Sequence, residues 1–199
     1  MRLATLAVDG GSTASVIDDG SVVPVEGYSD VGELLEAGPG WVVAAERALR
    51  EQERRPLDEA ELLRPITRPG AVFCVDLNYR SHILEMGREL PTSPTLFAKL
   101  ERSLTDPGAD IELPSASSSV NYEGELVVVV GRAGRDIPEV SASDYIAGYT
   151  LMNDVSMRDW QYRSLQWFAG KNFERSTPSR SAGGARRLSI PRTRRASRL

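Results

Sequence analysis

Cysteine and long apolar runs are nearly absent from this chain of 199 residues. The single cysteine, Cys74, excludes an internal disulfide and fits a reducing compartment. No apolar run is long enough to span a bilayer. The N-terminal "MRLATLAVDGG" has too short an apolar part for a signal peptide, and no small-residue cleavage site follows it. We therefore expect a cytoplasmic protein without a membrane partner.

Basic residues are scarce outside the C-terminal segment. Residues 179–199 hold seven arginines and no acid, which leaves 17 basic and 28 acidic residues in the rest, a net charge of −11. An acidic body binds nucleic acid poorly, and no aromatic residue lies among the arginines of the tail. A basic arm for nucleic acid or a membrane surface is thus the weakest interpretation, and we expect no nucleic-acid partner.

Two prolines in "RPITRPG" divide the chain near residue 65. Before them, residues 1–27 form short alternating runs separated by "DGGS" and "DDGS", which predicts a β-meander. Residues 29–63 have helical spacing, with caps at Ser29 and Asp30 and a further turn or two at "LDEAELL". After the prolines we expect a buried strand at "AVFCV", a helix in "DLNYRSHILEMGREL", strands at "TLFAKL", "NYEGELVVVVG" and "IAGYTLMND", and a helix from Ser156.

Two glutamates lie in the first half of the apolar strand "NYEGELVVVVG". Because side chains alternate along a strand, Glu123 and Glu125 point to one face and repel each other. Either the strand end is solvated or a divalent cation lies between the carboxylates. Asp154, at the end of "YTLMND", could join them from a neighbouring strand, although its position alone favours a helix N-cap. Such an all-oxygen site selects Mg²⁺, Mn²⁺ or Ca²⁺ over zinc.

Further candidates surround these carboxylates in the sequence. His82, the only histidine, precedes Glu85 by three residues, so on a helix the carboxylate can orient the imidazole as a general base. Lys171, between two phenylalanines, could hold an oxyanion. Arg158 and Gln161 share a helical face with Asp154, where a guanidinium can bind a substrate carboxylate. Taken singly, each of these residues is more simply interpreted as an ordinary surface residue.

Together these pieces resemble the fumarylacetoacetate hydrolase family over about residues 68–178. The resemblance is carried, in order, by "NYRSHILE", "PTLFAKL", "NYEGELVVVVG", "AGYTLMNDVSMRDWQ" and "GKNFERSTP". It implies Glu123, Glu125 and Asp154 as ligands of Mg²⁺ or Mn²⁺, with Ca²⁺ as a further option. It also implies a His82–Glu85 base pair, a catalytic Lys171 and substrate contacts from Arg158 and Gln161. Less direct matches are Thr177 and the tyrosine of "GYT", Tyr149 beside Thr150.

The resemblance implies an enzyme that hydrolyses, isomerises or decarboxylates β-diketo or 2-oxo acids. Members act on acylpyruvates, oxaloacetate or intermediates of aromatic catabolism, and the sequence does not choose among them. The implied fold is α+β, with a mixed, mostly β roll or partly open barrel. A small N-terminal extension would cover residues 1–65 and a partial catalytic domain residues 66–178. The family implies a homodimer.

The sequence departs from the family pattern in three places. Asp76 stands where the family has glycine, and there we expect the added carboxylate to disturb the site. Asn121 replaces a common aspartate, which we expect to be mild. After Pro178 the family continues with closing strands, whereas residues 179–199 are rich in Arg and Ser. We interpret them as an aberrant, disordered tail from a frameshift or truncation. The alternative to an active enzyme is therefore an inactive remnant.

Overall fold

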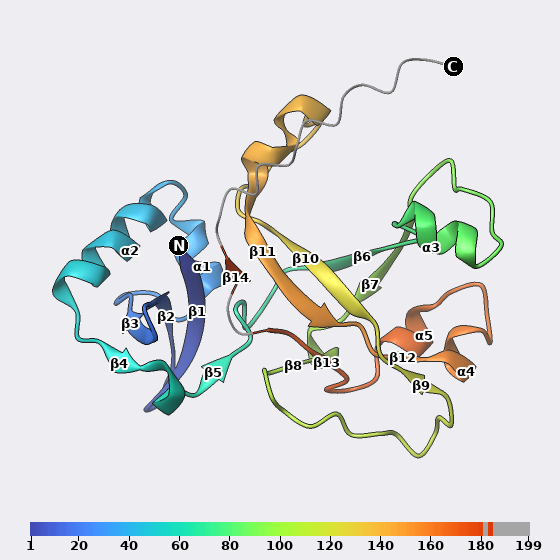
Figure 1. Ribbon diagram of the computed structural model, residues 1–199, viewed down its shortest axis with the longest axis horizontal. Helices are drawn as coiled ribbons and strands as arrows, with labels where there is room; N and C mark the ends of the chain where they lie inside the picture. Colours follow the sequence, from blue (N-terminus) through green and yellow to red (C-terminus); the bar gives the residue numbers. More distant parts are fainter. Residues whose placement is uncertain (181–182, 185–199) are drawn as a thin grey trace.

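The computed structural model describes residues 1–180 and 183–184 (Figure 1). The fold is α+β, as the resemblance implies, and a curved sheet runs through both parts of the chain. Within the described residues this sheet has eight strands, in the order β10-β11-β14-β1-β2-β3-β4, with β5 also paired to β1. Two-stranded sheets are formed by β12 with β9, β13 with β8 and β6 with β7. The β13–β8 pair is parallel, which makes the fold mixed.

The N-terminal meander forms as the alternating pattern predicts. Its strands are β1 (Arg2–Val8), β2 (Gly11–Asp18) and β3 (Ser21–Pro24), all antiparallel. The turn between β2 and β3 is Asp19-Gly20, and both residues have positive φ, 45° and 74°. Such a pair matches the twist of the flanking strands and fixes their register.

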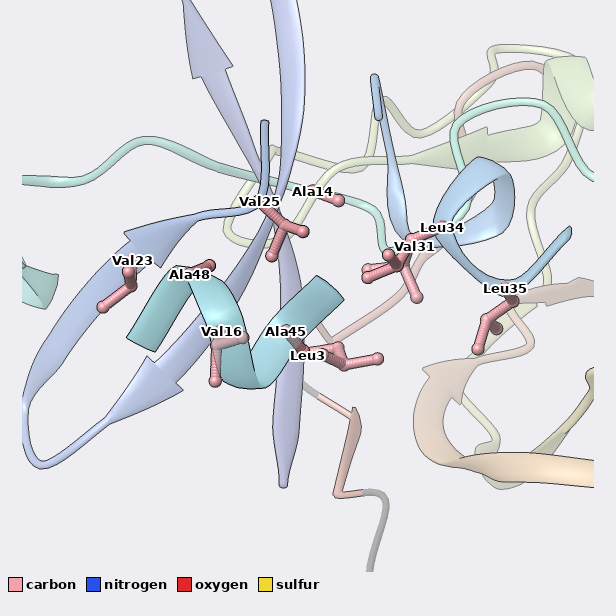
Figure 2. Packing of buried hydrophobic residues seen from close by; sticks show 10 residues of the cluster. All are labelled: Leu3, Ala14, Val16, Val23, Val25, Val31, Leu34, Leu35, Ala45 and Ala48. Atoms are coloured by element: carbon pink, nitrogen blue, oxygen red, sulfur yellow. The ribbon is translucent and has the colours of Figure 1, made fainter. Parts of the chain in front are cut away.

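Two helices cover the meander. Helix α1 (Val31–Glu36) begins after Asp30, whose side chain accepts a hydrogen bond of 2.8 Å from the Glu33 N–H. The Glu33 carboxylate in turn accepts from the Ser29 N–H at 2.6 Å, which confirms the predicted caps. Helix α2 (Gly40–Glu51) ends before Pro56. Figure 2 shows α2 lying across the meander, with Ala45 and Ala48 among the buried side chains.

The expected further helical turns at "LDEAELL" are largely wrong. The segment contains one short helix, η1 (Leu57–Glu59), between β4 (Arg55–Pro56) and β5 (Leu62–Leu63). The edge of β1 needs hydrogen-bonding partners, and this segment supplies them. Thr5 pairs with Leu63, and the Ala7 N–H donates to the Glu61 carbonyl at 2.9 Å. Tertiary pairing thus overrides helical spacing here.

The second part of the chain is built on two antiparallel strand pairs. The first pair is β6 (Val72–Asp76) with β7 (Thr95–Lys99), and α3 (Arg80–Glu85) follows β6. The second is β10 (Gly124–Val130) with β11 (Ile146–Asn153). Shorter elements complete the part, namely η2 (Glu101–Ser103), β8 (Leu104–Thr105), β9 (Val120–Asn121), η3 (Glu139–Tyr145), β12 (Ser156–Met157), α4 (Arg158–Gln161), α5 (Phe168–Lys171) and β13 (Thr177–Pro178).

Two expectations for this part need correction. The "AVFCV" strand is not buried, because Phe73 is 73% and Val75 48% exposed. The predicted helix does not begin at Ser156, since β12 first pairs with β9 and only four residues of α4 follow. The chain is then irregular until α5. Apolar side chains of β10 also point to solvent on one face, among them Leu126, Val128 and Val130.

The end of the described chain returns to the large sheet. Strand β14 (Gly183–Gly184) pairs with β1 and touches β11 through Tyr149. The Arg180 N–H donates to the Leu151 carbonyl at 2.8 Å. Most of the predicted disordered tail lies outside the described residues. Among the residues that are described, no helix has the length and apolar character required to cross a membrane.

Candidate active site

Glu123 and Asp154 meet where two neighbouring strands end. Glu123 directly precedes β10 and Asp154 directly follows β11, whose ladder pairs Gly124 with Asn153. The Asp154 N–H donates to the Glu123 carbonyl at 2.8 Å. The Asn153 side chain accepts a hydrogen bond of 3.0 Å from the Glu123 N–H. The predicted convergence of these two carboxylates from neighbouring strands is therefore present.

The Lys171 ammonium lies between the two carboxylates. Its Nζ atom is 2.7 Å from Glu123 Oε2 and 2.9 Å from Asp154 Oδ2. Lys171 ends the short helix α5 and is buried, with its ammonium 4.8 Å from the centre of the Phe97 ring. Asp154 is equally buried and does not cap α4, which begins after Met157. The N-cap interpretation of Asp154 is therefore wrong.

A second lysine, Lys99, holds Asp154 from the other side. Its Nζ atom donates to Asp154 Oδ1 at 2.6 Å and to the Lys171 carbonyl at 2.5 Å. Burial lowers the pKa of Lys99, while the neighbouring Asp154 carboxylate opposes that shift. We did not identify Lys99 from the sequence. The signal was present, because "TLFAKL" places a lone ammonium on the same strand face as Phe97.

Arg158 and Gln161 join the same cluster from α4. The Arg158 guanidinium pairs with Glu123 Oε1 and donates to Gln161 Oε1 at 2.8 Å. The Ser156 hydroxyl also donates to Glu123 Oε1, at 3.1 Å. Gly170 allows α5 to pack closely, since a Cβ there would lie 2.5 Å from the Gln161 backbone nitrogen. This close packing places Lys171 beside Arg158 and Gln161.

Glu125 is the third carboxylate of the set, but it has fewer hydrogen-bonding and ionic partners than Glu123 and Asp154. It faces Met152 across the ladder, one alternation beyond Glu123. Burial raises the pKa of Glu125, and repulsion by Glu123 and Asp154 raises it further. Within the part of the chain that the structure describes, its carboxylate makes no hydrogen bond or ion pair. This partial burial does not match the interpretation in which the two glutamates lie at a solvated strand end.

The donor chemistry of this set suits a hard cation. Three carboxylates offer only oxygen, the ligand that Mg²⁺ and Mn²⁺ prefer. The present arrangement does not close around an ion, because among residues 1–180 and 183–184 no three His, Cys, Asp or Glu side chains are positioned to hold one. Lys99, Lys171 and Arg158 occupy the oxygens of Glu123 and Asp154 instead. The oxygen donors are of the type that the cation prefers. Cation binding would require Glu123 and Asp154 to release part of their contacts with the lysines and the arginine.

His82 and Glu85 are placed on the surface. Their Nδ1 and Oε2 atoms are 3.9 Å apart on α3, and the side chains are 63% and 83% exposed. Among the described residues, no hydrogen bond or ion pair links either of them to Glu123, Asp154 or Lys171. The structure therefore forms the expected pair but does not bring it to the carboxylates.

The two less direct matches, Tyr149 and Thr177, lie around β11 and β13 together with Thr150. Thr150 is buried, and its hydroxyl donates to the Arg180 carbonyl at 3.1 Å. Thr177 is buried as well, and its hydroxyl has no hydrogen-bond partner within the described part of the chain. Tyr149 lines a small apolar cavity with Leu3 and Val129, between the two parts of the chain. Contact of these residues with a substrate remains a prediction.

Asp76 and Cys74 approach the cluster from β6. The backbone at Asp76 does not have a positive φ, whereas its neighbour Leu77 does, at 51°. Burial raises the pKa of Cys74 to about 12, and the Asp154 carboxylate contributes to that shift. Burial also raises the pKa of Asp76, which interacts with Lys171 and Glu123. Sequence alone did not place these β6 side chains at the carboxylates.

Known proteins are similar to this chain in sequence and in fold. The mitochondrial oxaloacetate tautomerase fahd2 of Xenopus laevis is 35% identical over 169 residues, 81% of this chain and 53% of that protein. The human mitochondrial oxaloacetate tautomerase FAHD2A is 39% identical over 149 residues, 73% and 48% of the two chains. The chain thus spans about half the length of these curated relatives.

Solved structures give the same result. A fumarylacetoacetate hydrolase from Exiguobacterium antarcticum has a TM-score of 0.80 at 29% identity, covering 93% of this chain and 66% of that one. A 2-hydroxyhepta-2,4-diene-1,7-dioate isomerase from Mycobacterium marinum has a TM-score of 0.69 at 27% identity, with the same coverage. The family model described as fumarylacetoacetate (FAA) hydrolase C-terminal matches residues 71–180. By sequence and by fold, the chain belongs to the fumarylacetoacetate hydrolase family.

Proposed function

We propose that this chain is a divalent-cation-dependent hydrolase or isomerase of β-diketo or 2-oxo acids. The observation that carries the proposal is the convergence of Glu123 and Asp154 on the buried Lys171 ammonium, at 2.7 and 2.9 Å. A buried carboxylate, a half-buried one, a lysine and a guanidinium in one cluster are the groups needed to bind a cation and an acidic substrate together. Among the described residues, these acidic and basic groups come together in this cluster.

Glu123, Glu125 and Asp154 would hold Mg²⁺ or Mn²⁺ in this proposal. A bound cation would supply Lewis-acid polarisation of a carbonyl oxygen. Lys171 would then stabilise negative charge that develops on the substrate, because its ammonium lies in a water-poor setting against Phe97. Arg158 would bind a substrate carboxylate, with Gln161 orienting the guanidinium through their 2.8 Å hydrogen bond.

His82 is the proposed general base. In hydrolysis its imidazole would take a proton from water, with the Glu85 carboxylate holding the ring. At 3.9 Å the two side chains are near each other but not hydrogen-bonded, and both are largely exposed. The proposal therefore requires α3 to approach the carboxylate cluster when substrate is present.

The named relatives support 2-oxo acids as the substrate class. Two of them are oxaloacetate tautomerases and a third is a dioate isomerase. The second candidate is an inactive remnant with the same family fold. The surface position of His82 and the apolar side chains of β10 that face solvent favour it.

A turnover assay separates the two candidates. The purified chain is incubated with Mn²⁺, and acylpyruvate hydrolysis and enol–keto conversion of oxaloacetate are followed by absorbance. We expect turnover that EDTA abolishes, that Asp154→Asn abolishes, and that the control Glu36→Gln, at an exposed position of α1, leaves intact. His82→Ala should lower hydrolysis by a factor of about 10² to 10⁴. Equal rates for the parent and Asp154→Asn would contradict the proposed site, and no turnover at all would favour the remnant.

A further inference from the structure

One face of the β6–β7 pair is directed at the carboxylate cluster. Antiparallel partners share a face, and the side chains of β6 alternate between half-buried and exposed. Phe73 and Val75 point to solvent. The other face carries three cross-strand rows, Val72 with Lys99, Cys74 with Phe97, and Asp76 with Thr95.

The first two rows of this face touch the cluster directly. In the first, Lys99 donates to Asp154 at 2.6 Å. In the second, the Phe97 ring lies 4.8 Å from the Lys171 ammonium. Successive rows are about 7 Å apart along a strand. Asp76 therefore lies one row beyond Phe97, on the face of the strand pair that is directed at the carboxylate cluster.

The Asp76 carboxylate interacts electrostatically with charged side chains of the cluster. Its carboxyl is half-buried, and its interactions include attraction to Lys171 and repulsion from Glu123. Arg88 also attracts it, but that side chain is exposed and acts more weakly than Lys171. Asp76 likewise repels Glu125. It is therefore a fourth carboxylate of the site, beside the three that the family pattern supplies.

A charge count shows what the fourth carboxylate changes. The cluster contains four carboxylates, those of Asp76, Glu123, Glu125 and Asp154, and three cations, Lys99, Lys171 and Arg158. The Cys74 thiol stays neutral because its pKa is raised to about 12. The cluster alone thus carries one negative charge. A divalent cation changes this to one positive charge, whereas without Asp76 the loaded cluster would carry two.

We propose that Asp76 is a specificity-determining residue that makes the cation-loaded site select 2-oxo acids with one negative charge over those with two. A monoanion neutralises the loaded cluster, whereas a dianion leaves an excess charge in a partly buried setting, where screening by salt is weak. This inference rests on the proposed function, because it requires a 2-oxo acid at the carboxylate cluster. It deepens that function by naming the charge class of the substrate.

The test compares two acids of equal chain length. Binding of 2-oxopentanoate, a monoanion, and 2-oxoglutarate, a dianion, is measured by calorimetry on the Mn²⁺-saturated full chain. The variants are Asp76→Asn and Asp76→Gly, two neutral replacements of different size, so that a folding defect in one leaves the other. Asp110→Asn, in an exposed loop of the same part of the chain, is the matched control.

Removal of the Asp76 charge should change the preference between the acids. We expect the ratio of the two affinities to move on the order of tenfold towards 2-oxoglutarate in both Asp76 variants, and not in Asp110→Asn. An unchanged ratio, or equal strengthening for both acids, would overturn the role of Asp76 and leave the proposed function intact. Failure of every form to bind either acid would overturn both.

Discussion

The Lys99 ammonium donates a 2.6 Å hydrogen bond to the Asp154 carboxylate, and the two side chains are only 0% and 3% exposed. Neither group retains appreciable contact with water, so each depends on the other for compensation of its charge. Asp154 is also paired with the Lys171 ammonium, whereas Lys99 donates only to the Lys171 carbonyl. Loss of one partner from such a pair leaves an uncompensated buried charge, which is far more costly than loss of a surface pair.

Replacement of Lys99 should therefore destabilise the protein strongly. We expect Lys99→Met to lower the free energy of unfolding by about 3 to 5 kcal/mol, measured by urea denaturation. The control is Arg102→Met, which breaks an exposed ion pair with Glu174 and should cost less than about 1 kcal/mol. A similar loss in the two variants would mean that the Lys99–Asp154 pair is no more important than a surface contact.

Gly170 should resist even the smallest side chain. In Gly170→Ala the new Cβ would lie 2.5 Å from the Gln161 nitrogen, so α5 must move away from α4. We expect a loss of about 1 to 3 kcal/mol in unfolding free energy, the usual cost of overpacking. Gly70→Ala is the control, since a Cβ there meets no atom within 4 Å. Equal stability of the two variants would contradict the close packing that positions Lys171.

Cys74 should react slowly with alkylating agents. Burial raises its pKa from 9.0 to about 12, and only the thiolate is nucleophilic. At about pH 8 the thiolate fraction is then roughly a thousandfold lower than for an unperturbed thiol. We expect slow modification by iodoacetamide in the folded chain and rapid modification in urea, followed by mass spectrometry. Rapid modification of the folded chain would show that Cys74 is not shielded beside the cluster.

The sequence was informative where local pattern and structure agree. Turn chemistry at Asp19-Gly20 and the Asp30 cap determine their elements almost alone, so the meander and α1 were predictable. The E-x-E spacing likewise predicted that Glu123 and Glu125 share a face. Such features depend on neighbours within a few residues.

The rest depends on contacts between distant segments. Lys99 and Lys171 are 72 residues apart, and no local pattern shows that one donates to the carbonyl of the other. Residues 62–63 were predicted to be helical but pair with β1 because its edge needs hydrogen bonds. His82 and Glu85 had the right spacing for a pair, yet spacing could not show that their helix lies at the surface.

Cation binding through Glu125 is the central claim, and thermal unfolding of the parent and Glu125→Gln tests it most directly. Burial and the neighbouring carboxylates raise the pKa of Glu125, so its ionised form destabilises the metal-free fold as pH rises through that pKa. In EDTA at neutral pH, Glu125→Gln should thus unfold at the same or a higher temperature than the parent. In millimolar Mn²⁺ the parent should gain several degrees and the variant little, because only the parent keeps all three ligands. An equal Mn²⁺ response in the two proteins would contradict the account.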